Sequence, residues 1–415
     1  MAIGIAELIL LGLLASWLFE RLRLPGLIGL LFVGILFGPY ALNLLNNEMQ
    51  LISSDLRLIA LIIILLRSGF ELSIKTLQRV GPRALLMAFL PCLLEVAAIT
   101  LTAPLLLPLS YLEAAMMGSV IAGVSLAVIV PHMIELIEEG LGIKSGVPTL
   151  IMAGTSSDNA FAIILCTSFI AMYVGDSVNI VWNILSVPIA AATGIALGLF
   201  LGFMFYRIFL KFNPRATKRT LVILGAAVML QSFQNEINTI FPFSALLAVM
   251  AIGLYILEQH EHMAHEISSK LGKIWIFAQV LLFTLIGTEV NIPIAVEAGL
   301  PSIAIILIGL SGRSIGVQLC MLGSTFTKKE RLFMTIAYLP KATVQAAIGA
   351  YPLLAMKAAG MDTAPGELIL AAAVLSIVLT APIGSLLIRF TKNRLLEKSV
   401  NPEKYSSYEA ITESR

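Results

Sequence analysis

Charged residues are scarce in this chain of 415 residues, because Asp, Glu, Lys and Arg make up 13% of it while 58% of its residues are hydrophobic. Ordinary soluble domains contain about 25% charged residues. Apolar stretches of about 18 to 28 residues follow one another along the whole chain, and each is long enough to cross a bilayer as a helix. A soluble fold is excluded. The sequence predicts an all-α polytopic membrane protein of about thirteen transmembrane helices.

Several catalytic and structural motifs are also missing. The three cysteines all lie inside apolar stretches, where we expect packing thiols and not a disulfide: Cys92, Cys166 and Cys320. The chain has no glycine-rich phosphate loop, which excludes ATP as the energy source. The segment 260–266, HEHMAHE, differs from a zinc-binding HExxH motif because Ala264 replaces the second histidine, so we expect a solvated connector there. We expect no enzyme, no cofactor, no resident metal and no nucleic-acid partner.

The positions of the spans and of the basic residues predict a topology. The predicted spans cover 2–20, 25–45, 57–72, 84–108, 111–135, 147–174, 180–206, 219–236, 241–257, 275–291, 297–323, 332–356 and 366–388. The third is short and is interrupted by Arg67 and Gly69, so we expect it to be tilted or partly re-entrant. Connecting segments after odd-numbered spans carry most Lys and Arg residues, whereas those after even-numbered spans carry only Arg57 and Lys357. This bias predicts an external N-terminus and a cytoplasmic C-terminus.

Two blocks of spans have the same layout, 84–174 and 297–388. Corresponding spans of the two blocks are seven spans apart, and this odd displacement predicts the inverted-topology repeat of secondary transporters. The middle span of each block contains a proline and is predicted to be interrupted, at 123–131 and at 338–345. A simple proline kink would explain either interruption alone. Both together predict a substrate site where two broken helices cross.

Asp158 is the most deeply placed carboxylate, and small polar residues surround it. An ionised carboxylate at the middle of a bilayer costs about 2.5–3.5 kcal/mol or more, so it is rarely retained without a role. Thr155, Ser157 and Asn159 can supply oxygen ligands or hydrogen bonds to it. We expect Asp158 to bind a proton and a small cation in competition. The alternative is a structural ion pair with Arg313 or Lys341.

The other charges within the spans have less specific predicted roles. Glu95 and Arg313 are expected to form a structural pair that links the two blocks. Lys341 lies in the second interruption, where it can neutralise the negative end of a half-helix. Glu289, near the outer end of the tenth span, is either a hydrated carboxylate or an accessory site residue. Arg67 is a further accessory candidate.

Several segments resemble the monovalent cation:proton antiporter superfamily, specifically its NHA-type sodium/proton antiporter branch. The resemblance rests on PCLLEVA (91–97), GVSLAVIVPHM (123–133), GIKSGVPTLIMAGTSSDNAFAI (142–163), GLSGRSIG (309–316) and YLPKATVQAAIG (338–349). It implies the sodium/proton antiporter fold, a homodimer with a transport core that rocks against a dimer domain, and an Arg313 shared by Glu95 and Asp158. That branch usually carries two adjacent aspartates, whereas this chain has Asp158 followed by Asn159.

The hypothesis that follows is that Glu95 forms the ion pair with Arg313, which leaves Asp158 free to act as the exchanging carboxylate. Asn159, Ser157, Thr155 and backbone oxygens near Ser125 then act as neutral ligands. One carboxylate that exchanges one proton for one cation predicts electroneutral transport. The expected activity is the antiport of Na+ or Li+, or of K+, against protons by alternating access. The alternatives are a transporter of the same fold for an organic or other anion, and an uncoupled channel-like protein.

The expected domains follow the blocks and the resemblance: 1–83 as N-terminal scaffold or dimer spans, 84–174 as the first repeat of the transport core, 175–274 as scaffold and linker spans, 275–391 as the tenth span with the second repeat, and 392–415 as a polar cytoplasmic tail. The expected partners are the transported cation, the proton, the lipid bilayer and a second copy of the chain. We expect the protein in the inner membrane of a bacterium.

Overall fold

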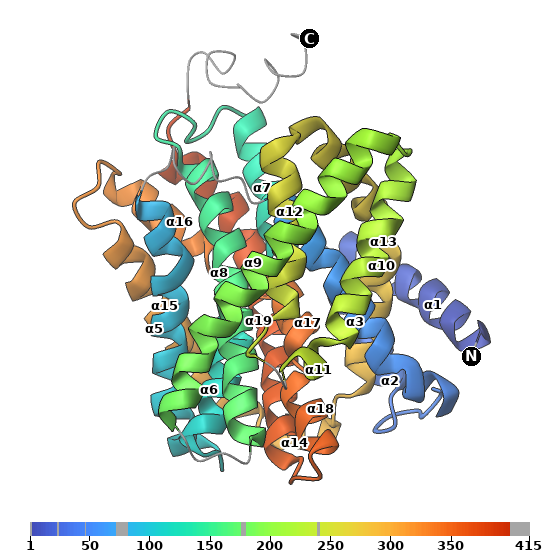
Figure 1. Cartoon of the computed structure of the whole chain (residues 1–415). Helices are drawn as coiled ribbons and strands as arrows, with labels where there is room; N and C mark the ends of the chain where they lie inside the picture. Colours follow the sequence, from blue (N-terminus) through green and yellow to red (C-terminus); the bar gives the residue numbers. More distant parts are fainter. Residues whose placement is uncertain are drawn as a thin grey trace. The chain divides into compact units, whose positions relative to one another are not determined.

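The computed structural model describes residues 2–22, 25–45, 47–71, 82–175, 180–238 and 241–398. Within these residues the regular elements are α-helices (Figure 1). They are, in chain order, α1 (Ala2–Arg21), α2 (Gly26–Phe37), α3 (Asn47–Glu71), α5 (Pro82–Leu106), α6 (Tyr111–Ala122), α7 (Leu126–Glu138), α8 (Val147–Val174), α9 (Ile180–Phe212), α10 (Ala216–Ser232), α11 (Gln234–Asn238), α12 (Ala245–Gln259), α13 (Glu261–Thr288), α14 (Ile292–Glu297), α15 (Gly299–Cys320), α16 (Lys328–Ala337), α17 (Thr343–Ile348), α18 (Tyr351–Ala358) and α19 (Ala364–Leu395).

Helices dominate because a bilayer offers no water to satisfy backbone N–H and C=O groups, and a helix pairs these groups within itself. Among the described residues, 6 helices are long and apolar enough to cross a membrane, and shorter apolar helices accompany them. The predicted all-α polytopic membrane class is confirmed.

The chain divides into two compact units. The first unit comprises residues 1–74, 164–297 and 346–371. In it α13 packs against α2 and α3, and α12 packs against α3 and α9.

The third predicted span is one continuous helix, α3, so the expected break at Arg67–Gly69 is wrong. The reason is that Gly69 serves helix packing. A Cβ atom added at Gly69 would lie 2.3 Å from the backbone oxygen of Met250 in α12. Small residues allow such close contact between helix backbones in a membrane.

The segment 260–266 is also not the expected connector, because α13 begins at Glu261. The His260 ring caps this helix by accepting a hydrogen bond from the Met263 N–H at 3.2 Å. Met263 and Ala264 are buried while His262 and His265 are exposed. The segment is therefore the amphipathic first turns of a long helix, which a hydropathy pattern alone does not reveal.

The second unit comprises residues 75–163, 298–345 and 372–415. Its α5 and α15 are the first helices of the two predicted blocks, and they pack against each other. Gly312 and Gly316 of α15 face the backbone of α5: a Cβ at Gly312 would lie 2.7 Å from the Leu94 oxygen, and one at Gly316 would lie 2.6 Å from the Pro91 Cα. This four-residue spacing of glycines is typical of close helix pairs in membranes.

Both predicted interruptions are present in the second unit, with one change of position. The first lies at residues 123–125, between α6 and α7, and Pro131 is inside α7. The break is set by Ser125, whose hydroxyl accepts a hydrogen bond from Val128 N–H and starts α7 as its N-cap. The second lies at residues 338–342, between α16 and α17. The Ser125 N–H donates to the Pro340 carbonyl at 2.9 Å, so the two breaks are in direct contact.

The predicted polar tail starts later than residue 392. Lys392 belongs to the last turns of α19, and its Nζ lies 2.9 Å from Glu135 and 2.6 Å from Glu139. The Gly142 N–H donates to the Glu397 carbonyl at 2.9 Å. These contacts order the chain to residue 398, and residues 399–415 of the predicted tail lie outside the described residues.

Candidate functional site

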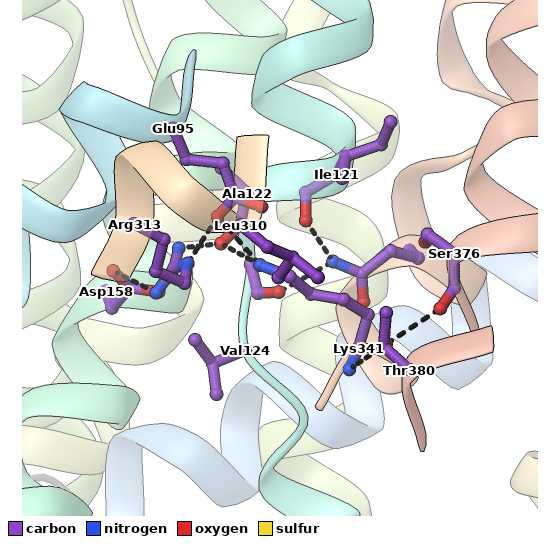
Figure 2. A network of polar contacts seen from close by, with 12 residues as sticks. Glu95, Ile121, Ala122, Val124, Asp158, Leu310, Arg313, Lys341, Ser376 and Thr380 are labelled. Carbon is purple, nitrogen blue, oxygen red and sulfur yellow. Dashed lines mark hydrogen bonds and ion pairs between the residues drawn. The ribbon is translucent and has the colours of Figure 1, made fainter. Parts of the chain in front are cut away.

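Four charged side chains lie together inside the second unit (Figure 2). Glu95, Asp158, Arg313 and Lys341 each have 0% relative exposure. They come from α5, α8, α15 and the break before α17. Because the two carboxylates balance the two cations, the cluster is neutral when all four are ionised.

Arg313 is the centre of the cluster. Its Nε donates to Glu95 Oε2, and its Nη1 and Nη2 donate to the two Asp158 oxygens at 3.3 Å and 3.2 Å. Its Nη2 also donates to the Ala122 carbonyl at the end of α6. The guanidinium lies 5.9 Å from the ring centroid of Tyr338, close enough for a cation–π contact.

Arg313 therefore contacts both carboxylates, as the resemblance implied. The hypothesis that Glu95 frees Asp158 from Arg313 does not hold in this conformation. The reason is geometric: a planar guanidinium has five donors, so Nε can serve Glu95 while Nη1 and Nη2 serve Asp158.

Lys341 provides a second cation for Glu95 and leaves Asp158 to Arg313. Its Nζ lies 2.8 Å from Glu95 Oε2 and 3.2 Å from the Ala122 carbonyl. Its backbone N–H donates to Thr380 Oγ1 at 2.9 Å, which fixes the interrupted segment against α19. The Lys341 ammonium thus lies at the C-terminal end of α6, where the helix dipole is negative, as the sequence predicted.

The polar residues near Asp158 make contacts of different kinds. Asn159 Oδ1 accepts a hydrogen bond from the Val124 N–H in the first break at 2.7 Å, and its Nδ2 has no hydrogen-bond partner among the described residues. The Thr155 hydroxyl donates to the Ile151 carbonyl at 2.8 Å, so its oxygen keeps lone pairs for another ligand. The Ser157 side chain lies outside the described residues.

Ser125 connects the two interruptions. It is fully buried, and its N–H and hydroxyl are both used, the first by Pro340 and the second by the start of α7. Its hydroxyl oxygen retains one lone pair, as an N-cap serine does.

The two accessory candidates belong to the first unit. Glu289 Oε1 lies 3.2 Å from Arg57 Nη2, and Glu289 Oε2 lies 3.7 Å from Lys357 Nζ. Arg67 lies within the continuous helix α3. Neither belongs to the cluster around Arg313 in the second unit.

Two site residues were missed by the sequence reasoning. Gln345 Nε2 donates to the Ile121 and Gly123 carbonyls at the end of α6, and Thr380 accepts the Lys341 N–H. Both are neutral, so neither stands out in a search for charges within apolar spans. The available signal for Gln345 was its position in the predicted interruption at 338–345.

The arrangement allows a carboxylate to change partners. An ionised carboxylate can accept about four hydrogen bonds, and the described contacts of Asp158 come from one guanidinium at more than 3 Å. A proton or a small cation can replace one of these contacts, and either one changes the net charge of the cluster by the same amount, while Glu95 stays paired with Lys341.

Comparison with known proteins shows the family of the chain. The family model described as a sodium/hydrogen exchanger, transmembrane, matches residues 8–393. The human protein "Sodium/hydrogen exchanger 9B2" is 35% identical over 387 residues, which cover 90% of this chain and 70% of that protein. The human "Sodium/hydrogen exchanger 9B1" is 30% identical over 392 residues, which cover 92% of this chain and 74% of that protein. The solved sodium proton antiporter MjNhaP1 of Methanocaldococcus jannaschii aligns with a TM-score of 0.81 at 21% identity, covering 95% of this chain and 98% of that one.

Proposed function

Since the chain belongs to the sodium/hydrogen exchanger family, we propose that it exchanges Na+ or Li+ for protons across a membrane, one ion for one proton, with Asp158 as the exchanging group. The single observation that carries the proposal is the burial of Asp158 together with its contacts with Arg313. Asp158 is a wholly buried carboxylate whose described contacts come from Arg313, beside two interrupted helices.

The proton and the cation compete for the same carboxylate. The cluster carries the same net charge whether Asp158 is protonated or is ionised with a bound Na+, so either ion can replace the other at this carboxylate. Asn159, Thr155 and Ser157 supply neutral oxygens around the ion. Exposure of this site to one side of the membrane at a time then makes the exchange obligatory.

Glu95, Arg313 and Lys341 keep the charge of the site constant during the cycle. Arg313 and Lys341 are both paired with carboxylates, so the positive balance that favoured an anion substrate is absent from the described cluster. The antiport of a cation is therefore the function that the charges support.

The wider setting is part of the same proposal. The second unit acts as the transport core, and the first unit forms the contact with a second copy in a homodimer within a lipid bilayer. The basic residues after odd-numbered spans support a cytoplasmic C-terminus and an external N-terminus. The membrane is the inner membrane of a bacterium, and Glu289 and Arg67 are at most accessory to transport.

The test is exchange by the purified protein in liposomes, measured with a pH-sensitive dye while Na+, Li+ or K+ is added outside. We expect Na+ and Li+ to drive proton movement in the wild type and no cation to do so in Asp158→Asn. The matched control is Asp362→Asn, the same chemical change at an exposed residue before α19. Exchange that persists in Asp158→Asn would remove Asp158 from the mechanism.

A further inference from the structure

Gln345 is a neutral side chain that meets the broken end of α6. It is fully buried, and its Nε2 donates to the Ile121 carbonyl at 2.8 Å and to the Gly123 carbonyl at 2.7 Å. The approach is close because Gly123 has no side chain: a Cβ there would lie 2.6 Å from Val344. Two carbonyl oxygens thus converge on one point, and an amide nitrogen occupies that point.

The Ile121 and Gly123 carbonyls bind a neutral amide, whereas the Ala122 carbonyl between them binds two charged side chains. The Ala122 oxygen receives Arg313 and Lys341, and both of these also bind Glu95. A cation that approached Ala122 would have to break buried ion pairs. A cation that approached the Gln345 amide would displace a neutral group only, so the ion pairs of the cluster would stay intact.

The other end of the Gln345 amide is an unused ligand. Its Oε1 is buried and has no hydrogen-bond partner among the described residues. An amide oxygen is an acceptor with two lone pairs. The last torsion of a glutamine side chain is broad, so rotation of the amide can exchange its NH₂ for its oxygen at the same place.

We infer that the carbonyl oxygens of Ile121 and Gly123, together with Gln345 Oε1, form a second binding place for a partly dehydrated monovalent cation. The cation enters it by displacing the amide NH₂ of Gln345. All three ligands are neutral oxygens, which suit a monovalent ion, as in the carbonyl rings of potassium filters. Calcium and magnesium sites rely on carboxylates in addition.

This second place lies directly beside the exchanging group. Ala122 lies between the two converging carbonyls, and its own oxygen accepts the Arg313 Nη2 that also binds Asp158. The inference rests on the proposed function and adds a step to it: the ion is held by neutral oxygens before or after its contact with Asp158. Gln345 then helps to decide which cation is accepted.

The experiment compares the wild type, Gln345→Leu, Gln345→Glu and Thr343→Val in liposomes, with the half-saturating concentrations of Na+, Li+ and K+ as the readout. Loss of one ligand to a charged ion predicts about a tenfold rise in Gln345→Leu. An added negative charge predicts about a tenfold fall in Gln345→Glu and a changed order among the three cations. Thr343→Val is the matched control, because the Thr343 hydroxyl is buried on the same helix without a hydrogen-bond partner among the described residues.

A second readout separates this inference from the proposed function. The thermal stabilisation of the detergent-purified proteins by NaCl, LiCl and KCl, relative to choline chloride, reports cation binding without transport. Wild-type stabilisation that is weakened in Gln345→Leu and strengthened in Gln345→Glu supports the second place even if no exchange is observed. If Gln345→Leu does not fold, Gln345→Glu decides the matter. Half-saturating concentrations and stabilisation in Gln345→Glu that stay within twofold of the wild type overturn the inference, while exchange by the wild type would leave the proposed function intact.

Discussion

At the scale of single residues, the cluster around Arg313 contains two carboxylates and two cations, and the two carboxylates have different numbers of cationic partners. Glu95 receives both Arg313 and Lys341, whereas the described partner of Asp158 is Arg313 alone. The more firmly held carboxylate is therefore suited to structure, and the less firmly held one to exchange. A buried ion pair need not add stability overall, but removal of one member leaves a charge that water cannot reach.

This unequal pairing predicts the stability of charge-removing variants. Glu95→Gln leaves two cations with one carboxylate, and we expect it to lower the free energy of unfolding by about 3–5 kcal/mol. Glu95→Gln combined with Lys341→Met leaves Asp158 and Arg313 as a neutral pair, so we expect a smaller loss than in the single variant. Thermal unfolding of the proteins in detergent measures both.

The control for that comparison is Glu261→Gln. Glu261 pairs with His265 at the start of α13, where both side chains are more than half exposed, so its removal should have almost no effect. A double variant less stable than Glu95→Gln would contradict the charge-balance argument, because neutrality would then not be what the cluster requires.

At the scale of elements, the site depends on how closely helices approach. The pairing of α5 with α15 brings Glu95 to Arg313, and it requires the absence of side chains at two positions of α15. The contact of Ser125 with Pro340 then fixes the two interrupted helices against each other. The positions of the charges are therefore consequences of backbone contacts that involve no charge.

A single methyl group should disturb this pairing. In Gly312→Ala the new Cβ would lie 2.7 Å from the Leu94 oxygen, so α5 and α15 must move apart. We expect a loss of about 1–3 kcal/mol in the free energy of unfolding, together with weaker exchange, because overpacking shifts the backbone. Unfolding in detergent and exchange in liposomes measure the two effects.

Gly299→Ala is the control within the same helix. A Cβ at Gly299 meets no atom of the described residues within 4 Å, so this variant should behave as the wild type. Equal stability of the two variants would show that the close contact is not required.

At the scale of the whole molecule, charge conservation determines the response to voltage. If one carboxylate exchanges one proton for one cation, the loaded and protonated forms carry equal charge, and the membrane potential does no work on the cycle. We expect exchange by the wild type in liposomes to be unchanged when the potential is clamped at different values with a potassium ionophore. A rate or end point that follows the potential would exclude one-for-one exchange.

The variant Asn159→Asp should make exchange depend on the membrane potential. Asn159 uses its side-chain oxygen to accept the Val124 N–H, and an aspartate retains that acceptor while it adds a charge. We expect this variant to fold and to exchange in a voltage-dependent manner. Voltage-independent exchange would mean that the second carboxylate does not titrate during the cycle.

How much of this could be predicted from the sequence depends on the kind of signal. Long apolar runs predict the spans, and prolines mark the two interrupted spans, although Pro131 lies inside α7 and the first break is set by Ser125. The cost of burying charge singles out Asp158, Glu95, Arg313 and Lys341. Hydropathy carries no signal for the polar first turns of α13 or for the packing role of Gly69. Hydropathy also does not predict the role of Gln345, because neutral polar residues are common in spans. Only the path of the backbone shows which carbonyl groups such a residue contacts.

The burial of the three cysteines has a practical consequence for spectroscopy. Cys92 and Cys166 have 0% relative exposure and Cys320 has 2%, so water-soluble thiol reagents do not reach them in the folded protein. Labels can therefore be attached at introduced cysteines without removing the native ones. A dye or spin label at Asp362→Cys in the first unit and another at Thr325→Cys in the second, both at exposed positions, would report the distance between the units as the bath changes from choline to Na+.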